Sequence, residues 1–269
     1  MEEVFDAADQ RLAPYSDLKD SALRRKAELH GGYFVVEGRL AMEAVLASPY
    51  PLESVLVLRR RLGVLDGLPL APATAVYVVD EPVMAGVTGF DVHRGLLGLG
   101  RRLPGRPAES LLEDTASRVV VVVEGVNDQE NLGAIFRNAA AFAAGALFLD
   151  PTSSDPLYRR TVRVSLGHSL RVPFARLVPW PESLELLGKN GFVLLALTPA
   201  TSAEPVQSVA DALHGSRVAL LVGAERSGLS DAVLRSARRV RIPMAAGVDS
   251  LNVATALGVA LHGFADFGR

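Results

Sequence analysis

The sequence predicts an α/β fold, with a parallel sheet in its C-terminal part and a smaller α/β domain before it. Its length of 269 residues suggests about two domains. After residue 118, short continuous apolar runs alternate with segments of helical periodicity, which is typical of parallel strands covered on both faces. A composition of 49% hydrophobic and 22% charged residues excludes wholesale disorder, so both parts are expected to fold.

The N-terminal part contains the first set of expected elements. Its first 30 or so residues are expected to form an exposed helix that carries a basic run at 24–26. Apolar runs predict strands at 34–37, 54–58, 75–79 and 96–99, with a helix at 39–47. These elements place one domain at residues 1–102. The segment 103–117 combines prolines, glycine and charges between two strand patterns, which predicts a linker.

The C-terminal domain is placed at residues 118–269. Its apolar runs predict strands at 119–123, 146–149, 193–197, 218–222 and 240–242. Helical patterns lie between them at 132–144, 157–167, 181–188 and 231–237, and a long helix follows from about residue 250. That last helix is apolar nearly all round, so we expect it to be buried or to lie in an oligomer interface.

Several function classes are excluded or weakened by what the sequence lacks. The absence of cysteine excludes disulfides, zinc–cysteine sites and thiol catalysis. Five histidines show no metal-ligand spacing, so no metal is expected, and no dinucleotide, P-loop or nucleophile-elbow motif stands where such chemistry needs one. The acidic start has no signal-peptide core, and no apolar run reaches the roughly 18 residues of a membrane span. We therefore expect a soluble, cytoplasmic protein.

The charge pattern leaves nucleic-acid binding open. A net charge of −2 argues against a nucleic-acid binder, because such domains are usually basic overall. However, 25 of the 28 basic residues are arginines, and many stand in clusters. Genomic base composition could explain the arginines, and each cluster taken alone could be a solvated face. Arginine also suits phosphate recognition, because its rigid fork of donors matches phosphate oxygens.

Polar residues gather at three predicted strand ends, which is where doubly wound sheets bind ligands. In the first segment, Asn131 is expected to cap a helix, and Arg137 follows six positions later. Taken alone, Arg137 is better explained as an exposed arginine on a helix surface. In the second, residues 220–230, Glu225 lies in a turn, and Ser227 or Gly228 precedes a helix, which by itself could be a tight connection.

The third segment, residues 242–262, begins the long apolar helix. We expect Ser250 or Asp249 to cap that helix. Asn252 is the exception in an apolar stretch. If it is buried, its amide must find hydrogen-bond partners or cost stability, so we expect it to face a site.

Taken together, the three segments resemble the three motifs of the SPOUT superfamily, with the SpoU/TrmH-type RNA ribose 2′-O-methyltransferases as the best match. The motifs are N-L-G-A-I-F-R at 131–137, L-V-G-A-E-R-S-G-L-S at 221–230, and I-P-M at 242–244 with S-L-N-V at 250–253. A fourth segment, S-S-D-P-L-Y-R-R-T-V-R-V-S-L-G-H-S-L-R-V-P, also fits. The resemblance covers residues 118–269. Residues 32–100 resemble more weakly the L30e-like substrate-binding domain of these enzymes, through F-V-V-E-G at 34–38 and H-R-G at 93–95.

The resemblance implies a deep trefoil knot, a homodimer built on the last helix, and S-adenosylmethionine as cofactor. The cofactor site it implies consists of Leu197, Thr198, Gly223, Ile242, Met244 and Leu251. The catalytic set consists of Arg137, Asn131, Glu225, Ser250 and Asn252. Arg137 would clamp an RNA phosphate, and the proton of the 2′-hydroxyl would pass to a phosphate oxygen or to an arginine of unusual pKa. Arg24, Arg25, Arg101, Arg102, Arg159 and Arg163 become candidate RNA contacts.

One departure from the family pattern keeps a second interpretation open. After S-L-N-V the family usually has a serine, where this chain has Ala254. A noncatalytic RNA-binding protein is therefore the alternative to an enzyme, and an ordinary small-molecule enzyme is a weaker third. Among RNA substrates, the N-terminal domain favours 23S ribosomal RNA, with transfer RNA as the alternative.

Overall fold

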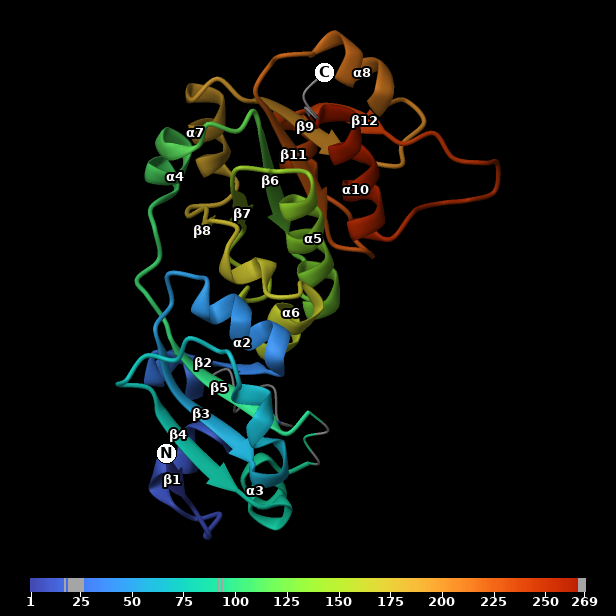
Figure 1. Cartoon of the computed structure of the whole chain (residues 1–269). Coiled ribbons are helices and arrows are strands. Elements are labelled where there is room, and N and C mark those ends of the chain that lie inside the picture. The colour runs from blue at the N-terminus through green and yellow to red at the C-terminus, as the bar shows by residue number, and fades with distance from the viewer. Residues whose placement is uncertain (17, 19–26, 91, 93, 266–269) are drawn as a thin grey trace. The chain divides into compact units, whose positions relative to one another are not determined.

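The computed structural model describes residues 1–16, 18, 27–90, 92 and 94–265, and its contacts divide the chain into two compact units (Figure 1). The first unit contains residues 1–104 and 157–171, and the second contains residues 105–156 and 172–269. This division differs from the predicted one at 157–171, because helix α6 (Arg159–Val164) packs on strand β2 (Tyr33–Glu37). Sequence order alone does not show which of two units such a segment contacts.

The first unit is built on a five-stranded mixed sheet in the order β1-β4-β3-β5-β2. Its strands are β1 (Glu2–Glu3), β2, β3 (Leu52–Leu58), β4 (Ala75–Val79) and β5 (Leu96–Arg101). Strands β1, β4 and β3 are parallel, and β5 runs antiparallel to both β3 and β2. The four predicted strands and helix α2 (Arg39–Leu46) are confirmed, whereas α3 (Glu81–Thr88) was not predicted. The L30e-like interpretation stays a prediction, and His93 of H-R-G lies outside the described residues.

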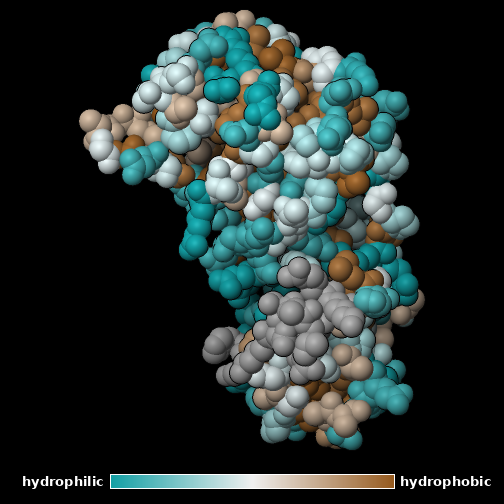
Figure 2. Space-filling model, turned by 180° about the vertical axis from the view of Figure 1, so that it is seen from behind, coloured by the Kyte–Doolittle hydropathy of each residue, from teal (hydrophilic) through white to brown (hydrophobic). Residues whose placement is uncertain are grey.

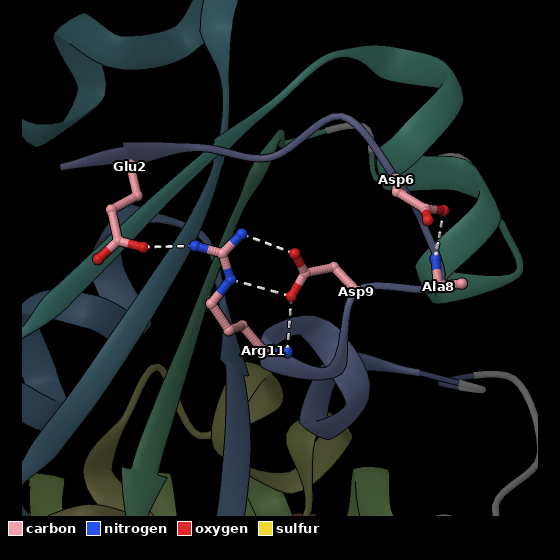
Figure 3. A network of polar contacts seen from close by, with 5 residues as sticks. All are labelled: Glu2, Asp6, Ala8, Asp9 and Arg11. Atoms are coloured by element: carbon pink, nitrogen blue, oxygen red, sulfur yellow. Dashed lines mark hydrogen bonds and ion pairs between the residues drawn. The ribbon is translucent and has the colours of Figure 1, made fainter.

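Among the described residues, the exposed helix expected over the first 30 or so residues is present only at 27–31, whereas residues 1–16 form no such helix. Residues Gln10–Tyr15 form a short 3₁₀ helix, η1, whose Leu12 and Tyr15 are fully buried. Arg11 holds this turn to β1, because its guanidinium donates to both Asp9 and Glu2 (Figure 3). Those hydrogen bonds from Arg11 lower the pKa of Asp9 to about 2.

The second unit contains the predicted parallel sheet, with seven strands in the order β10-β12-β9-β11-β6-β7-β8. The strands are β6 (Val119–Glu124), β7 (Leu147–Leu149), β8 (Phe174–Arg176), β9 (Val193–Leu197), β10 (Glu204–Pro205), β11 (Val218–Gly223) and β12 (Arg238–Arg241). Every pairing is parallel. The five predicted strands are confirmed, and β8 and β10 were missed because two or three residues carry too little periodicity.

Helices cover both faces of this sheet, as the continuous apolar runs indicate. In β6, Val119, Val121 and Val123 face one core while Val120 and Val122 face the other. The first core is covered by α5 (Gln129–Ala141), α8 (Val206–Ala212) and α10 (Val253–Phe264). The second is covered by α4 (Ala108–Asp114) and α7 (Glu185–Lys189), which Figure 1 labels, and by α9 (Asp231–Ser236).

Helix α4 corrects the predicted linker at 103–117. Its Leu111 and Leu112 are buried in the second core. The prolines and glycine that predicted a linker stand before the helix, whereas A-E-S-L-L-E-D carries apolar residues at helical spacing. The composition of the whole segment 103–117 therefore concealed the helical spacing of apolar residues within 108–114.

Candidate functional site

A cavity of about 410 Å³ lies in the second unit, where β9, β11 and β12 end. Ligand sites of open α/β sheets occur at this edge. Most of the lining residues stand in three chain segments, at 197–199, 222–229 and 242–256, and Leu234 and Val240 complete the lining. All six predicted cofactor residues are among the lining residues: Leu197, Thr198, Gly223, Ile242, Met244 and Leu251. The structure therefore brings the predicted set together, while its role stays a prediction.

The wall at 223–229 is a tight backbone loop that depends on glycine. A Cβ on Gly223 would lie 2.2 Å from the carbonyl carbon and oxygen of Gly228, so no other residue fits there unless the backbone shifts. Gly228 has a positive φ of 65°, and its N–H donates to the Ala224 carbonyl at 2.8 Å. The strand can therefore turn back sharply and expose backbone groups to the cavity.

Three of the predicted catalytic residues meet at the edge of this cavity. Asn252 donates from Nδ2 to Asn131 Oδ1 and to Glu225 Oε1, both at 2.8 Å. Its Oδ1 accepts the backbone N–H groups of Ala254 and Thr255, at 3.0 and 3.2 Å. Asn252 is exposed rather than buried, yet its amide has hydrogen-bond partners at the cavity edge.

The helix caps differ from those that the sequence predicted. Asn252 itself caps α10, in place of Ser250 or Asp249. Asp128 caps α5 by accepting two backbone N–H groups, so Asn131 lies within the first turn of that helix. Several residues that can cap stand close together in both segments, and only the backbone geometry selects one. Helix α9 likewise begins after Ser230 rather than after Ser227 or Gly228.

Arg137 and Ser250 stand apart from this hydrogen-bonded group. Arg137 lies on α5, is exposed, and makes no hydrogen bond or ion pair with any residue that the structure describes. Ser250 is exposed and lines the cavity. The site thus offers a free guanidinium on one helix and a small-molecule cavity at the start of another.

Comparison with known proteins decides the family. Residues 118–262, more than half of the chain, match the SpoU rRNA methylase family. The chain belongs to the SpoU rRNA methylase family. It is 43% identical over 265 residues to an uncharacterized tRNA/rRNA methyltransferase of Mycobacterium tuberculosis, covering 97% of this chain and 91% of that protein. It is 29% identical to a 23S rRNA (guanosine-2′-O-)-methyltransferase of Ralstonia nicotianae, covering 88% of this chain and 94% of that protein.

Solved structures agree with the fold of a SpoU methylase. An AdoMet-bound rRNA methyltransferase of Sinorhizobium meliloti superposes with a TM-score of 0.81 at 24% identity, covering 98% of this chain and 97% of that one. An RNA 2′-O ribose methyltransferase superposes with a TM-score of 0.76 at 27% identity, covering 98% of each chain. Both structural similarities cover residues of the first and of the second unit.

The sequence interpretation missed Glu124 as a residue of this SpoU methylase site. Glu124 ends β6, and its Oε2 accepts the backbone N–H of Ser230 at 2.7 Å. Its Oε1 accepts the indole N–H of Trp180 at 2.8 Å. The carboxylate therefore holds the far end of the loop that lines the cavity. A charged residue directly after an apolar strand was the available sequence signal.

The candidate RNA contacts of this SpoU methylase have different surroundings. Arg24 and Arg25 lie outside the described residues. The other four are in the first unit, where Arg101 pairs with Glu53, Arg102 lies 3.6 Å from Glu28, Arg159 pairs with Glu37, and Arg163 has no partner among the described residues. The Arg102 side chain is only 14% exposed. Arg163 is thus the described candidate with the freest guanidinium.

Two further observations bear on the predicted absences. Within the described ranges, no group of three metal-ligating side chains comes together. Among the same residues, no helix is long and apolar enough to cross a membrane.

Proposed function

We propose that this chain transfers the methyl group of S-adenosylmethionine to a ribose 2′-hydroxyl of RNA, with its chemistry at the cavity edge. The observation that carries the proposal is the meeting of the six predicted cofactor residues around one cavity, bordered by the Asn131–Asn252–Glu225 hydrogen bonds. Residues from three segments of the chain converge there, which chance placement does not explain.

The cavity fits the cofactor in size and chemistry. Its volume of about 410 Å³ falls within the range of small-molecule sites. Leu197, Ile242, Met244 and Leu251 offer apolar contact, and the loop at Gly223 offers backbone groups. S-adenosylmethionine carries no phosphate, so the site needs no glycine-rich phosphate loop. When bound, the cofactor supplies an electrophilic methyl group on a sulfonium.

The chain's residues orient the ribose 2′-hydroxyl, and the RNA itself accepts the proton of that hydroxyl. Arg137 binds an RNA phosphate and holds the ribose in line, because a guanidinium hardly ever deprotonates and suits phosphate binding. The 2′-hydroxyl proton passes to a phosphate oxygen of the RNA. Asn131, Ser250 and Asn252 position the ribose, and Glu225 orders the loop through its bond to Asn252. Alignment of this kind is worth several orders of magnitude in rate.

An Arg137→Ala variant tests the assignment. We expect the fold and the affinity for S-adenosylhomocysteine to be unchanged and the rate of methyl transfer to fall by at least about 100-fold, since the phosphate clamp is lost. Lys189→Ala is the control, because Lys189 is an exposed cation of the same unit, and Glu185 is its one ion-pair partner among the described residues. Near-normal turnover by Arg137→Ala would show that the site is assigned wrongly.

Ribosomal RNA is the proposed substrate, and specifically 23S rRNA. Two features support it: the similarity to a 23S rRNA (guanosine-2′-O-)-methyltransferase over 88% of this chain, and the presence of a first unit beside the methyltransferase unit. The test is to map 2′-O-methyl sites in RNA from a deletion strain and its parent. Loss of one site in 23S rRNA supports the proposal. Loss only in transfer RNA would overturn the target and leave the reaction standing.

The noncatalytic alternative rests on Ala254, whose side chain is buried at the start of α10. Its backbone N–H is held by Asn252, so the first turn of α10 forms without a side-chain hydroxyl at this position. The enzyme and the noncatalytic protein are separated by tritium transfer from labelled S-adenosylmethionine to RNA. Binding of RNA and cofactor with no transfer would favour the noncatalytic protein.

A second copy of this chain is the proposed partner, in the cytoplasm where the RNA substrate resides. Apolar side chains stay exposed on α10 and the loop before it: Val248 at 49%, Leu251 at 38% and Val259 at 45%. In Figure 2, residues coloured as hydrophobic, tan to brown, lie on the outside of the segment that projects at the left. Light scattering should give twice the chain mass, and Val259→Glu should give the monomer. A monomeric wild-type chain would overturn this. The trefoil knot stays a prediction.

A further inference from the structure

Helices α5 and α10 contact each other at three levels along their length. Asn131 accepts from Asn252 at the first level. Asn138 donates from Nδ2 to the backbone carbonyl of Ala254 at 2.7 Å at the second. The rings of Phe142 and His262 meet edge-on, with centroids 6.1 Å apart, at the third. Asn131 and Asn138 are seven residues apart, or about two turns, so they share one face of α5.

The Asn138 amide fits its place closely. The residue is half-buried, and the carbonyl that it binds belongs to the buried Ala254. One turn further along α10, a Cβ on Gly258 would lie 3.2 Å from Asn138 Nδ2, which is tighter than ordinary contact. Glycine at 258 therefore leaves the space in which the amide approaches α10.

Asn138 lies close to the proposed reaction site in both helices: it is next to Arg137 in α5, and it binds the start of α10. On α5 it follows Arg137, and because adjacent helical residues point about 100° apart, Arg137 is exposed while Asn138 contacts α10. On α10, the carbonyl that it holds lies three residues after Leu251, which lines the cavity. One amide thus joins the helix of the proposed phosphate clamp to the start of the helix beside the cofactor cavity.

We propose that Asn138 is a positioning residue for methyl transfer, which sets the first turn of α10 and the cavity edge against Arg137. This inference rests on the proposed function. A displacement of about 1 Å between reacting groups can cost about 100-fold in rate. RNA and cofactor are each bound by other contacts. Loss of the Asn138 hydrogen bond should therefore lower kcat and leave the RNA KM and the cofactor affinity unchanged.

The main test compares Asn138→Ala with a matched control, Asn190→Ala. Asn190 also donates its amide to a backbone carbonyl, that of Leu186 at 2.8 Å, and is also half-buried, but it ends α7 on the other face of the sheet. Both variants should lose similar thermal stability. Asn138→Ala should lower kcat by about 10-fold or more, with the RNA KM and the calorimetric Kd for S-adenosylhomocysteine within about twofold of wild type. Asn190→Ala should keep its kcat.

Two further variants keep the test decisive if Asn138→Ala folds poorly. Gly258→Ala retains the amide but crowds it, so it should lower kcat in the same direction. Asn138→Gln retains an amide donor, so it should recover part of the kcat that alanine loses. Hydrogen exchange supplies a readout without turnover: the first turn of α10 should exchange faster in Asn138→Ala and be unchanged in Asn190→Ala.

The inference is overturned if Asn138→Ala loses no more kcat than Asn190→Ala, or if its loss lies in KM. Its failure is distinct from failure of the proposed function. Near-normal turnover by Arg137→Ala overturns the proposed function whatever Asn138 does. An inactive Arg137→Ala beside a normal Asn138→Ala overturns only the positioning role.

Discussion

Asn252 uses all of its side-chain hydrogen-bonding groups, although it is exposed. The oxygen accepts two backbone N–H groups at the start of α10, and the nitrogen donates to Asn131 and Glu225. One atom therefore stabilises the helix and the other orders the site. Because the two tasks belong to different atoms, a substitution can remove one without the other.

Replacing Asn252 with serine and with alanine separates the two tasks. Serine caps helices well, so Asn252→Ser should keep nearly wild-type stability but lose most of the methyl-transfer rate, since it cannot reach both partners. Asn252→Ala should lose the rate and also about 0.5–2 kcal/mol of unfolding free energy. Urea unfolding and initial rates measure the two effects. Full activity in Asn252→Ser would contradict a site role for the amide.

Asp150 is a buried carboxylate at the end of β7. Burial by itself would raise the pKa of Asp150, but hydrogen bonds from Ser153, Thr152 and the Gly125 backbone outweigh it and leave that pKa below its usual value. A lowered pKa means that the ionised carboxylate stabilises the fold above its unfolded pKa of about 3.9. That contribution is lost as the pH falls through the folded pKa.

Asp150→Asn should therefore destabilise the protein most at neutral pH. The NH₂ of asparagine would face N–H and O–H groups that now donate hydrogen bonds to the carboxylate. The free energy of unfolding should therefore fall by about 1–3 kcal/mol at pH 7. The difference from wild type should shrink below about pH 4, as the wild-type carboxyl protonates. Urea unfolding across this range measures it, with the exposed Asp211→Asn as control. A difference that stays constant with pH would refute the account.

At the scale of elements, the loop over the cavity is held at its far end by a strand and a tryptophan. Glu124 at the end of β6 accepts from Ser230 and from Trp180. Residues 222–229 line the cavity directly before that contact. A ligand that shifts the loop therefore changes the surroundings of Trp180, which is the only tryptophan in the sequence.

Titration with S-adenosylhomocysteine should change the emission of Trp180, with a midpoint equal to the calorimetric Kd. Glu124→Gln should weaken binding, since Trp180 and Ser230 donate to different carboxylate oxygens and the amide NH₂ would face one of these donors. A conservative control is Trp180→Phe, which should bind more weakly than wild type and give no tryptophan emission change. Calorimetric binding with silent wild-type emission would contradict the coupling.

At the scale of the whole molecule, a net charge of −2 gives no general basic field for RNA. Affinity then depends on separate arginines whose guanidinium groups are free. Within the described ranges, Arg163 is exposed and unpaired, whereas Arg159 pairs with Glu37. Each phosphate contact releases counterions and so adds to the salt dependence of binding.

Arg163→Ala should weaken RNA binding several-fold and reduce the slope of log K against log salt by about 0.7–0.9, as expected for one phosphate contact. Arg106→Ala is the control, because Arg106 pairs with Asp114 and belongs to no proposed contact. Binding at several salt concentrations measures both quantities. An unchanged slope in Arg163→Ala would remove this residue from the RNA surface.

The sequence by itself determined the parallel sheet and five of its seven strands, and the family resemblance that its motifs carry supplied the residues around the cavity. These features depend on residues that are neighbours in the sequence, namely apolar stretches such as 119–123 and short motifs directly after strands. Parallel strands deliver such motifs to one edge of a sheet, so the site follows once the strands are known. Gly223 and Met244 stand in two of these motifs and Leu197 was added by the family resemblance, and all three line one cavity.

Only the tertiary structure decided the contacts between distant segments. It selected Asn252 as the cap of α10, joined Asn138 to Ala254 across 116 positions, and brought Glu124 to Ser230 across 106. It also placed 157–171 with the first unit and α4 in a core. A single hydrogen bond between distant segments produces no repeating pattern of apolar residues in the sequence. It depends instead on how closely two backbones approach each other in the folded chain.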